Sequence, residues 1–154
     1  MSEEIWKEEL RRYFDTVRII ERAKAETLES FDQFSEFIAE PAFESLAEEL
    51  KDYGIRIRFR KDRGLFIKFR LSFPGSRIDN FFYTIVLPRN SYELRLGLVL
   101  KGRRRPGSVL EEKKEEFMKG LSPAEIIKID KERLIQDILQ HYRDFNFAAL
   151  TSPE

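Results

Sequence analysis

The chain has 154 residues, the size of one ordinary domain, and its 28 basic and 28 acidic side chains cancel to a net charge of zero. It has no cysteine and a single histidine, His141. These counts exclude disulfide scaffolds, thiol catalysis, Fe–S clusters, cysteine zinc sites and any site that needs two histidines from one chain. The highly charged composition, poor in Asn and Gln, is typical of thermophile proteins.

The sequence shows neither a secretory signal nor a membrane span, which predicts an intracellular protein with a cytoplasmic location. The first ten residues carry acids and a tryptophan, whereas a secretory signal carries bases followed by an unbroken apolar stretch. The longest apolar run, Phe81 to Leu87, has seven residues including one threonine, and a membrane helix needs about 20. We therefore expect no membrane span.

Apolar residues recur at alternating steps of four and three along the first part of the chain, which indicates a helix. Two polar members of this stripe and an S-x-x-Q box at Ser30 predict a kink or break near residue 30. Pro41 suits the first turn of a second helix over residues 41–52. The full stripe is Trp6, Leu10, Tyr13, Val17, Ile20, Lys24, Thr27, Phe31, Phe34 and Ile38.

The apolar period then changes to two, which predicts strands. Ile57 and Phe59 alternate with arginines, and apolar residues resume at odd positions after a turn over 62–64 that contains Gly64. A hairpin with Gly64 in the left-handed conformation would pair residue 59 with 67 and residue 57 with 69. Two further alternating runs, residues 81–87 and 92–100, complete a predicted four-stranded antiparallel meander.

The last third of the chain predicts helices. Ser108 with Glu111 is typical of a capped helix that Gly120 would close, and further helices are expected after Ser122 and Asp130. Residues 125–129 fit an edge strand equally well. We therefore predict a single α+β domain over residues 1–154, of order ααββββαα, with the N-terminal and C-terminal helices packed on one face of the sheet.

Charge is divided sharply along the chain: residues 1–52 hold 7 basic and 15 acidic side chains, residues 53–105 hold 14 and 3, and residues 106–154 hold 7 and 10. The expected register turns a basic, partly aromatic face away from the core. It also pairs Arg56 with Arg70 and Arg58 with Lys68, and like charges across a ladder repel. The candidate binding residues are Arg56, Arg58, Arg60, Phe66, Lys68, Arg70, Phe82 and Arg95 on the sheet, with Arg103, Arg104 and Arg105 in the connector that follows it.

Three kinds of partner could neutralise this basic face. They are the chain's own acidic helices, an acidic protein surface including a second copy of the chain, and nucleic acid, whose bases could stack on Phe66 and Phe82. The zero net charge disfavours nucleic acid, because attraction to a polyanion depends on the whole field. We expect a non-enzymatic binding or assembly module for an acidic protein partner or a second copy. The alternative is a nucleic-acid-binding protein.

No pattern of catalytic residues stands out. His141 lies on the stripe of the last predicted helix, which indicates packing at the edge of the core. No P-loop, G-x-G-x-x-G or G-x-S-x-G occurs, so no cofactor is expected. Asp79 with Glu93 and Arg95 is loosely similar to the D…(D/E)-x-K pattern of Mg-dependent, restriction-endonuclease-like nucleases, but an arginine cannot deprotonate to activate water. An enzyme is therefore the less favoured interpretation.

Overall fold

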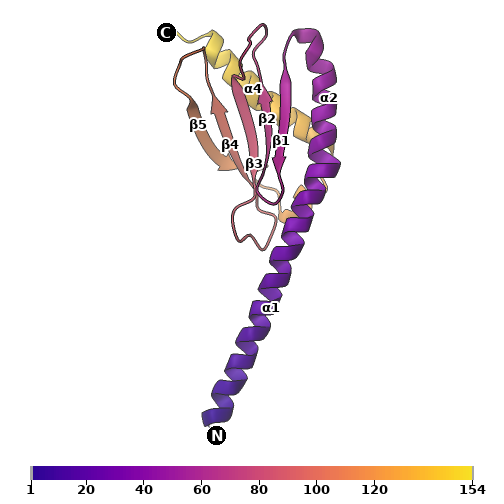
Figure 1. The fold of residues 1–154 in the computed structure, drawn as a ribbon, viewed down its shortest axis with the longest axis vertical. Coiled ribbons are helices and arrows are strands. Elements are labelled where there is room, and N and C mark those ends of the chain that lie inside the picture. Colours follow the sequence, from indigo (N-terminus) through magenta and orange to yellow (C-terminus); the bar gives the residue numbers. More distant parts are fainter. Residues whose placement is uncertain (1, 154) are drawn as a thin grey trace.

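The computed structural model describes residues 2–153, which form one five-stranded sheet flanked by helices (Figure 1). The sheet is an antiparallel meander in which the strands follow one another in chain order. This confirms the α+β class and corrects the predicted four strands to five. The strands are β1 (Ile57–Asp62), β2 (Phe66–Leu71), β3 (Phe81–Val86), β4 (Gly97–Gly102) and β5 (Glu111–Glu116), and the α-helices are α1 (Ser2–Phe34), α2 (Glu40–Leu50), α3 (Pro123–Ile126) and α4 (Lys131–Leu150).

The helix α1 runs straight through the position of the predicted kink near residue 30, so that prediction is wrong. The irregularity lies further on, where residues Ser35–Ala39 form a π-helical turn between α1 and α2. Pro41 explains this position. It has no N–H for the helix ladder, and its ring would clash with the carbonyl four residues earlier, so a wider turn just before it relieves the conflict.

The β1–β2 hairpin keeps the predicted faces but not the predicted register. Ile57 pairs with Leu71 and Phe59 with Phe69, a shift of two residues from the expected pairing. The three-residue loop consists of residues 63–65, and the Leu65 N–H donates to the Asp62 carbonyl at 3.0 Å. Gly64 adopts the expected left-handed conformation with φ of +73°. Because the side-chain period is two, a shift of two residues leaves every apolar residue on the core side.

The fourth strand is shorter than predicted because residues 92–96 are not part of it. The Arg95 N–H donates to the Glu93 carbonyl at 2.8 Å, and this local bond is incompatible with a ladder at that point. Leu94 and Leu96 are nevertheless buried, as their alternation indicated. The regular strand begins at Gly97, which pairs with Val86.

Residues 111–116 form the edge strand β5 where the sequence predicted a helix over 108–120. Ser108 does not cap a helix: its hydroxyl accepts from the Arg105 N–H and donates to the Arg105 carbonyl, which closes a turn. Strong local helix formers are overridden because β5 pairs with the otherwise open edge of β4 and carries Phe117 into the core, where it is 1% exposed. Glu and Lys alternate along each face of β5, and such charged side chains suit an exposed sheet edge.

The two C-terminal helices begin where their caps predicted. Ser122 and Glu125 form a capping box at the start of α3, and the Asp130 carboxylate accepts from the Arg133 N–H at the start of α4. The alternative of an edge strand over 125–129 is therefore wrong. Leu134, Ile138 and Tyr142 are the buried positions of α4.

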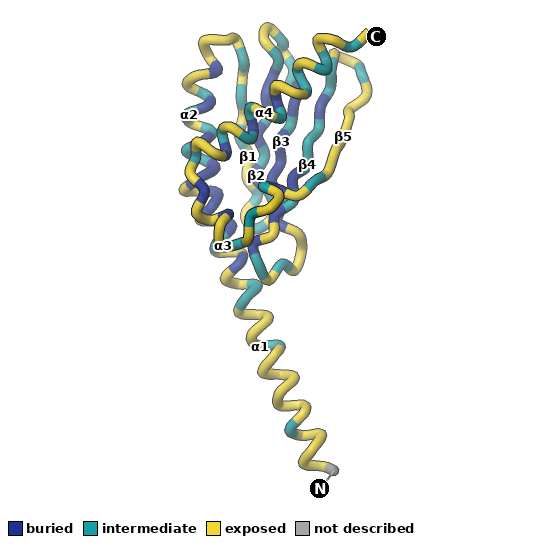
Figure 2. Tube along the Cα trace, turned by 180° about the vertical axis from the view of Figure 1, so that it is seen from behind, coloured by how far each residue is buried: buried dark blue, intermediate teal, exposed yellow. Residues whose placement is uncertain are grey.

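Helix α4 covers one face of the sheet, as a comparison of the view in Figure 1 with that from behind in Figure 2 shows. The hydroxyl of Tyr83 in β3 donates to Asp137 of α4 at 2.5 Å, and the hydroxyl of Tyr142 donates to the Ser72 carbonyl at 2.9 Å. Because side chains alternate along a strand, Phe82 and Thr84 point to the opposite side. We call that side the outer face, and no helix of residues 2–153 lies over it in Figure 1.

The first part of α1 projects away from this body (Figures 1 and 2). Between residues 3 and 22 every residue is exposed except Glu8 and Val17, which are half-buried. The same helix enters the core at its other end, where Phe31 and Phe34 are 1% and 2% exposed. Across the described residues no helix has both the length and the apolar character that crossing a membrane would require.

Candidate functional site

The outer face carries two rows of basic side chains that run across the strands. Neighbouring strands lie about 4.8 Å apart, so members of one row are adjacent. Asp62 and Phe66 begin a third row, nearer the hairpin loop, which contains no basic residue. The first row is Arg58, Arg70, Phe82, Lys101 and Glu112, and the second row is Arg60, Lys68, Thr84, Val99 and Lys114.

The shift in the β1–β2 register changes which like charges lie opposite each other, but the number of like-charge pairs stays at two. Arg58 lies opposite Arg70, and Arg60 lies opposite Lys68, where the sequence predicted Arg56 opposite Arg70 and Arg58 opposite Lys68. Each pair is repulsive by a few tenths of a kcal/mol or more. The basic character that the sequence predicted is therefore real, and it is concentrated on β1 and β2.

Two acids from the chain itself partly neutralise this face, and the sequence did not single out either for that role. Asp62 lies 3.6 Å from Arg60 Nη2. Asp79, in the loop before β3, lies 3.6 Å from Arg56 Nη2 and 3.9 Å from Arg58 Nη1. The guanidinium of Arg56 also donates to the Arg77 carbonyl at 2.8 Å. The sequence contained one sign of this role, because Asp79 is one of only three acids in residues 53–105. In these contacts the acids come from β1 and from the loop before β3, and not from the acidic helices that were one of the three possible partners.

Lys68 lies in the middle of the basic rows, and three cations face it. Burial lowers the pKa of Lys68, and the positive charges of Lys101, Arg70 and Arg60 lower it further, with Asp62 opposing them. Its ammonium group lies 5.5 Å from the centre of the Phe66 ring and 5.9 Å from that of Phe82. These rings stabilise the lysine by cation–π attraction, which replaces part of its lost hydration.

The remaining predicted arginines do not join the two rows. Arg95 lies before β4, at the opposite end of that strand from Lys101, and its Nε is 3.0 Å from Glu93. Arg103 follows β4 directly and donates its N–H to the Asn80 carbonyl. Arg104 contacts the Glu111 carboxylate through two nitrogens, at 2.7 and 3.2 Å, and the Ala148 carbonyl of α4 at 3.5 Å. Arg105 is exposed in the connector.

The nuclease-like acids are separated by the length of a strand. Asp79 precedes β3, whereas Glu93 lies beyond its far end, and the six residues of β3 span roughly 20 Å. Each acid also forms ion pairs with arginine: Asp79 with Arg56 and Arg58, and Glu93 with Arg95. The pair that the sequence suggested does not converge on one metal position.

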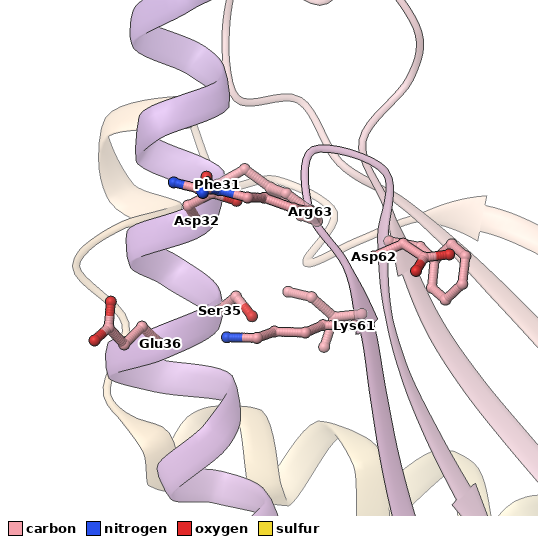
Figure 3. A pocket seen from close by; sticks show the side chains of 9 residues that line it. Phe31, Asp32, Ser35, Glu36, Lys61, Asp62 and Arg63 are labelled. Atoms are coloured by element: carbon pink, nitrogen blue, oxygen red, sulfur yellow. Dashed lines mark hydrogen bonds and ion pairs between the residues drawn. The ribbon is translucent and has the colours of Figure 1, made fainter.

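A hollow of about 340 Å³ lies between the π-helical turn and the tip of the β1–β2 hairpin (Figure 3). Ser35 points from the helix toward the hairpin, and its buried hydroxyl has no hydrogen-bond partner among the described residues. The two basic side chains around it are already paired, Arg63 with Asp32 at 2.7 Å and Lys61 with Glu40 at 2.5 Å. Among the described residues the hollow therefore offers one free hydroxyl and no unpaired cation, and it is a weaker candidate than the outer face.

His141 lies at the junction of α4 with the sheet, at the edge of the core. Its Nε2 is 3.4 Å from Glu115 and 3.6 Å from Asp137, which also accepts from the Tyr83 hydroxyl. Burial raises the pKa of Tyr83 well above its usual range, and the charge of Asp137, its hydrogen bond to that carboxylate and the charge of Glu115 add to the rise. These four side chains join α4 to β3 and β5.

Comparison of the chain with protein-family models, with curated proteins and with solved structures finds no match.

Proposed function

We propose that the protein is a non-enzymatic binding module whose outer sheet face holds an acidic protein segment. The observation that carries this proposal is the crowding of Lys68 by Arg60, Arg70 and Lys101 on a face that α4 does not cover. Burial and like charges both disfavour its ammonium form. A carboxylate that reached this point would offset the like charges and favour the ammonium form, so the site suits an anion.

The two rows define the shape of the partner. Three cations of the first row, Arg58, Arg70 and Lys101, span three strand spacings, roughly 14 Å. Arg60 and Lys68 of the second row lie beside them, two residues further along the strands. A short acidic segment laid across the strands would therefore meet three cations in one row and two in the next. Guanidinium groups bind carboxylates with two parallel hydrogen bonds, which favours arginine in this role.

Two features favour protein carboxylates over nucleic acid. The Phe66 and Phe82 rings are half-buried and already contact cations, Arg60 and Lys68 for Phe66 and Lys68 for Phe82, so they are poorly placed to stack on bases. Glu112 and Glu116 of β5 lie on the same side of the sheet and would repel a long phosphate backbone. With zero net charge, the protein also lacks the general attraction to polyanions that nucleic-acid-binding proteins use.

The test is fluorescence anisotropy with a labelled Glu/Asp-rich peptide of about a dozen residues, and with single-stranded and double-stranded oligonucleotides, each at two salt concentrations. We expect the peptide to bind and to weaken as salt rises. Arg58→Glu should weaken peptide binding by about fivefold, the equivalent of about 1 kcal/mol.

The control is Lys128→Glu, which makes the same charge change at an exposed position between α3 and α4 and should leave peptide affinity unchanged. Tight, salt-steep binding of the oligonucleotides with no binding of the peptide would instead support the nucleic-acid alternative. An equal loss in both variants would show that only net charge matters and would reject the outer face as the site.

A further inference from the structure

The projecting part of α1 exposes a row of large apolar side chains that nothing in the described chain covers. Trp6 is 50% exposed, Leu10 47%, Tyr13 61% and Ile20 40%. A helix that stands free in water gains stability mainly by burying such a face, and contiguous exposed apolar surface marks interaction sites. Among residues 2–153, the body contacts this stripe only from about Lys24 onward.

The spacing of the stripe is that of a coiled coil. Trp6, Leu10, Tyr13, Val17 and Ile20 follow steps of four, three, four and three. A strict seven-residue repeat of this kind brings one helix against another along a single seam. The same stripe continues into Phe31 and Phe34, which the chain's own body buries. The projecting part of the stripe therefore has the spacing of a coiled coil but no second helix to pack against.

We infer that a second copy of the chain supplies this helix, and that the two copies of α1 pair antiparallel about a two-fold axis near residue 15. In this register the residue numbers of facing core positions sum to 30, so Leu10 faces the second copy's Ile20 and Tyr13 faces its Val17. Residue 2 then reaches residue 28 of the other copy. The overlap covers the whole projecting segment and ends within the stretch of α1, from about Lys24, that the other copy's body contacts.

The polar positions of the stripe select this orientation. In a parallel pair, Lys24 would face Lys24 of the second copy across the seam, which places like charges together in a partly buried position. In the antiparallel pair, Lys24 faces Trp6, and an ammonium group over an indole ring is attractive. Lys24 is 31% exposed in the single chain and lies 3.5 Å from Glu21, so it already leans along the stripe.

The charged residues that flank the apolar seam also favour the antiparallel orientation. Lys7 and Glu21 each follow a core residue directly, at positions that meet each other in antiparallel coiled coils. The register above therefore sets Lys7 beside Glu21 of the second copy, twice by symmetry. A parallel pair would instead set Glu9 beside Phe14 and Thr16 beside Glu21, with no ion pair. Charge complementarity thus favours the antiparallel arrangement.

A hollow at the base of α1 fits the free end of the second copy. It has a volume of about 230 Å³ and lies beside Ala23 and Thr27, with Tyr92 and Ile127 in its wall. Tyr92 and Ile127 are 61% and 46% exposed in the single chain. The antiparallel register brings Ile5 and Trp6 of the second copy to residues 25 and 24, next to this apolar wall. The dimer would then bury the outermost apolar side chains as well as the seam.

The arrangement separates the two bodies. Each body first contacts α1 near residue 24, so the nearest parts of the two bodies would lie roughly 27 Å apart along the paired helices, at a rise of about 1.5 Å per residue. The dimer does not depend on what the outer face binds. If the outer faces of both copies bind, however, an acidic partner with two sites contacts both copies at once, which raises the avidity of binding.

The first test is the mass of the full chain in solution by light scattering over a range of concentrations. We expect a dimer, and we expect Leu10→Glu to give a monomer while the body stays folded by circular dichroism and melting. The matched control is Ile19→Glu, which places the same charge on an exposed residue off the seam (69% exposed) and should leave the dimer intact. A monomer at every concentration, or an assembly larger than two, would overturn the inference.

The second test fixes the orientation and uses the absence of cysteine from the sequence. Leu10→Cys and Ile20→Cys are made separately and oxidised alone and as a mixture. The antiparallel register predicts a disulfide between chains only in the mixture, because each cysteine then faces the other variant's cysteine within disulfide range. Disulfide dimers of either variant alone would show a parallel pair and contradict the register.

Discussion

Arg58 and Arg70 lie directly opposite each other on β1 and β2, two like charges on the outer face of the sheet. Arg58 has a carboxylate nearby, that of Asp79 at 3.9 Å, whereas the buried Nε of Arg70 has no hydrogen-bond partner among the described residues. The pair therefore does not contribute to folding in the way that a salt bridge would. Such an arrangement is expected where charge is held ready for a partner.

Replacing Arg70 with glutamine should leave the melting temperature unchanged or slightly raised, because the variant loses a repulsion worth a few tenths of a kcal/mol and no salt bridge. Arg56→Gln is the comparison. It loses the contact with Asp79 at 3.6 Å and the hydrogen bond to the Arg77 carbonyl, and should cost up to about 1 kcal/mol. Thermal melts at low salt measure both. A clear loss of stability in Arg70→Gln would mean that this arginine is a structural residue.

Phe31 and Phe34 anchor α1 in the core, and truncating either to alanine should cost about 3 to 5 kcal/mol in the free energy of unfolding. Phe37 is three residues further along and 68% exposed, so Phe37→Ala should change stability little. Denaturant titrations compare the three variants. Similar values for Phe31→Ala and Phe37→Ala would contradict the packing of this part of the helix.

The two glycines that begin and end β4 should respond differently to alanine. A Cβ at Gly102 would lie 2.1 Å from Phe145 Cζ, so this ring would have to leave its contacts with Phe73 and Phe81. We expect Gly102→Ala to cost about 1 to 3 kcal/mol. At Gly97 the nearest atom is the Val86 carbonyl oxygen at 3.9 Å, and the same change should be tolerated. Equal melting temperatures for the two variants would show that α4 does not pack over Gly102.

Stability should fall as pH rises from about 10 to about 12, and Tyr142 should account for part of the slope. Burial raises the pKa of Tyr142 to about 12, whereas an unfolded tyrosine releases its proton near pH 10. Between these values the unfolded chain binds fewer protons than the folded one, so the free energy of unfolding decreases with pH; below pH 10 this contribution is constant. Tyr142→Phe should flatten the slope, measured by denaturant titration at several pH values. The exposed Tyr92 offers the control, Tyr92→Phe, which should leave it unchanged.

Side-chain periodicity was enough to predict the α+β class, an antiparallel meander of the first four strands and the core side of those four strands. The caps at Ser122 and Asp130 were enough to start the last two helices. The β1–β2 register could not be fixed in the same way, because shifting a strand by two residues preserves every face. In the structure Asp62 lies opposite Phe66 at the base of the loop.

The edge strand β5 was missed for a different reason. Glu111 to Glu116 contains only Glu and Lys, whose local preference is for helix, and its strand conformation is imposed by the neighbouring edge of β4. Local sequence carries no sign of that edge. The basic face was predictable from alternation alone, whereas the position of Asp79 depends on a loop that no pattern describes.

The most direct test of the proposed function is to map the acidic peptide on the protein by backbone amide chemical shifts. We predict that the shifts change at residues 58–60, 68–70, 82–84 and 99–101, which together form the two basic rows of the outer face. The amides of residues 3–10 and of the solvent side of α4 should stay where they are. Shifts confined to α1 or α4 at saturating peptide would contradict the account, because the partner would then bind elsewhere.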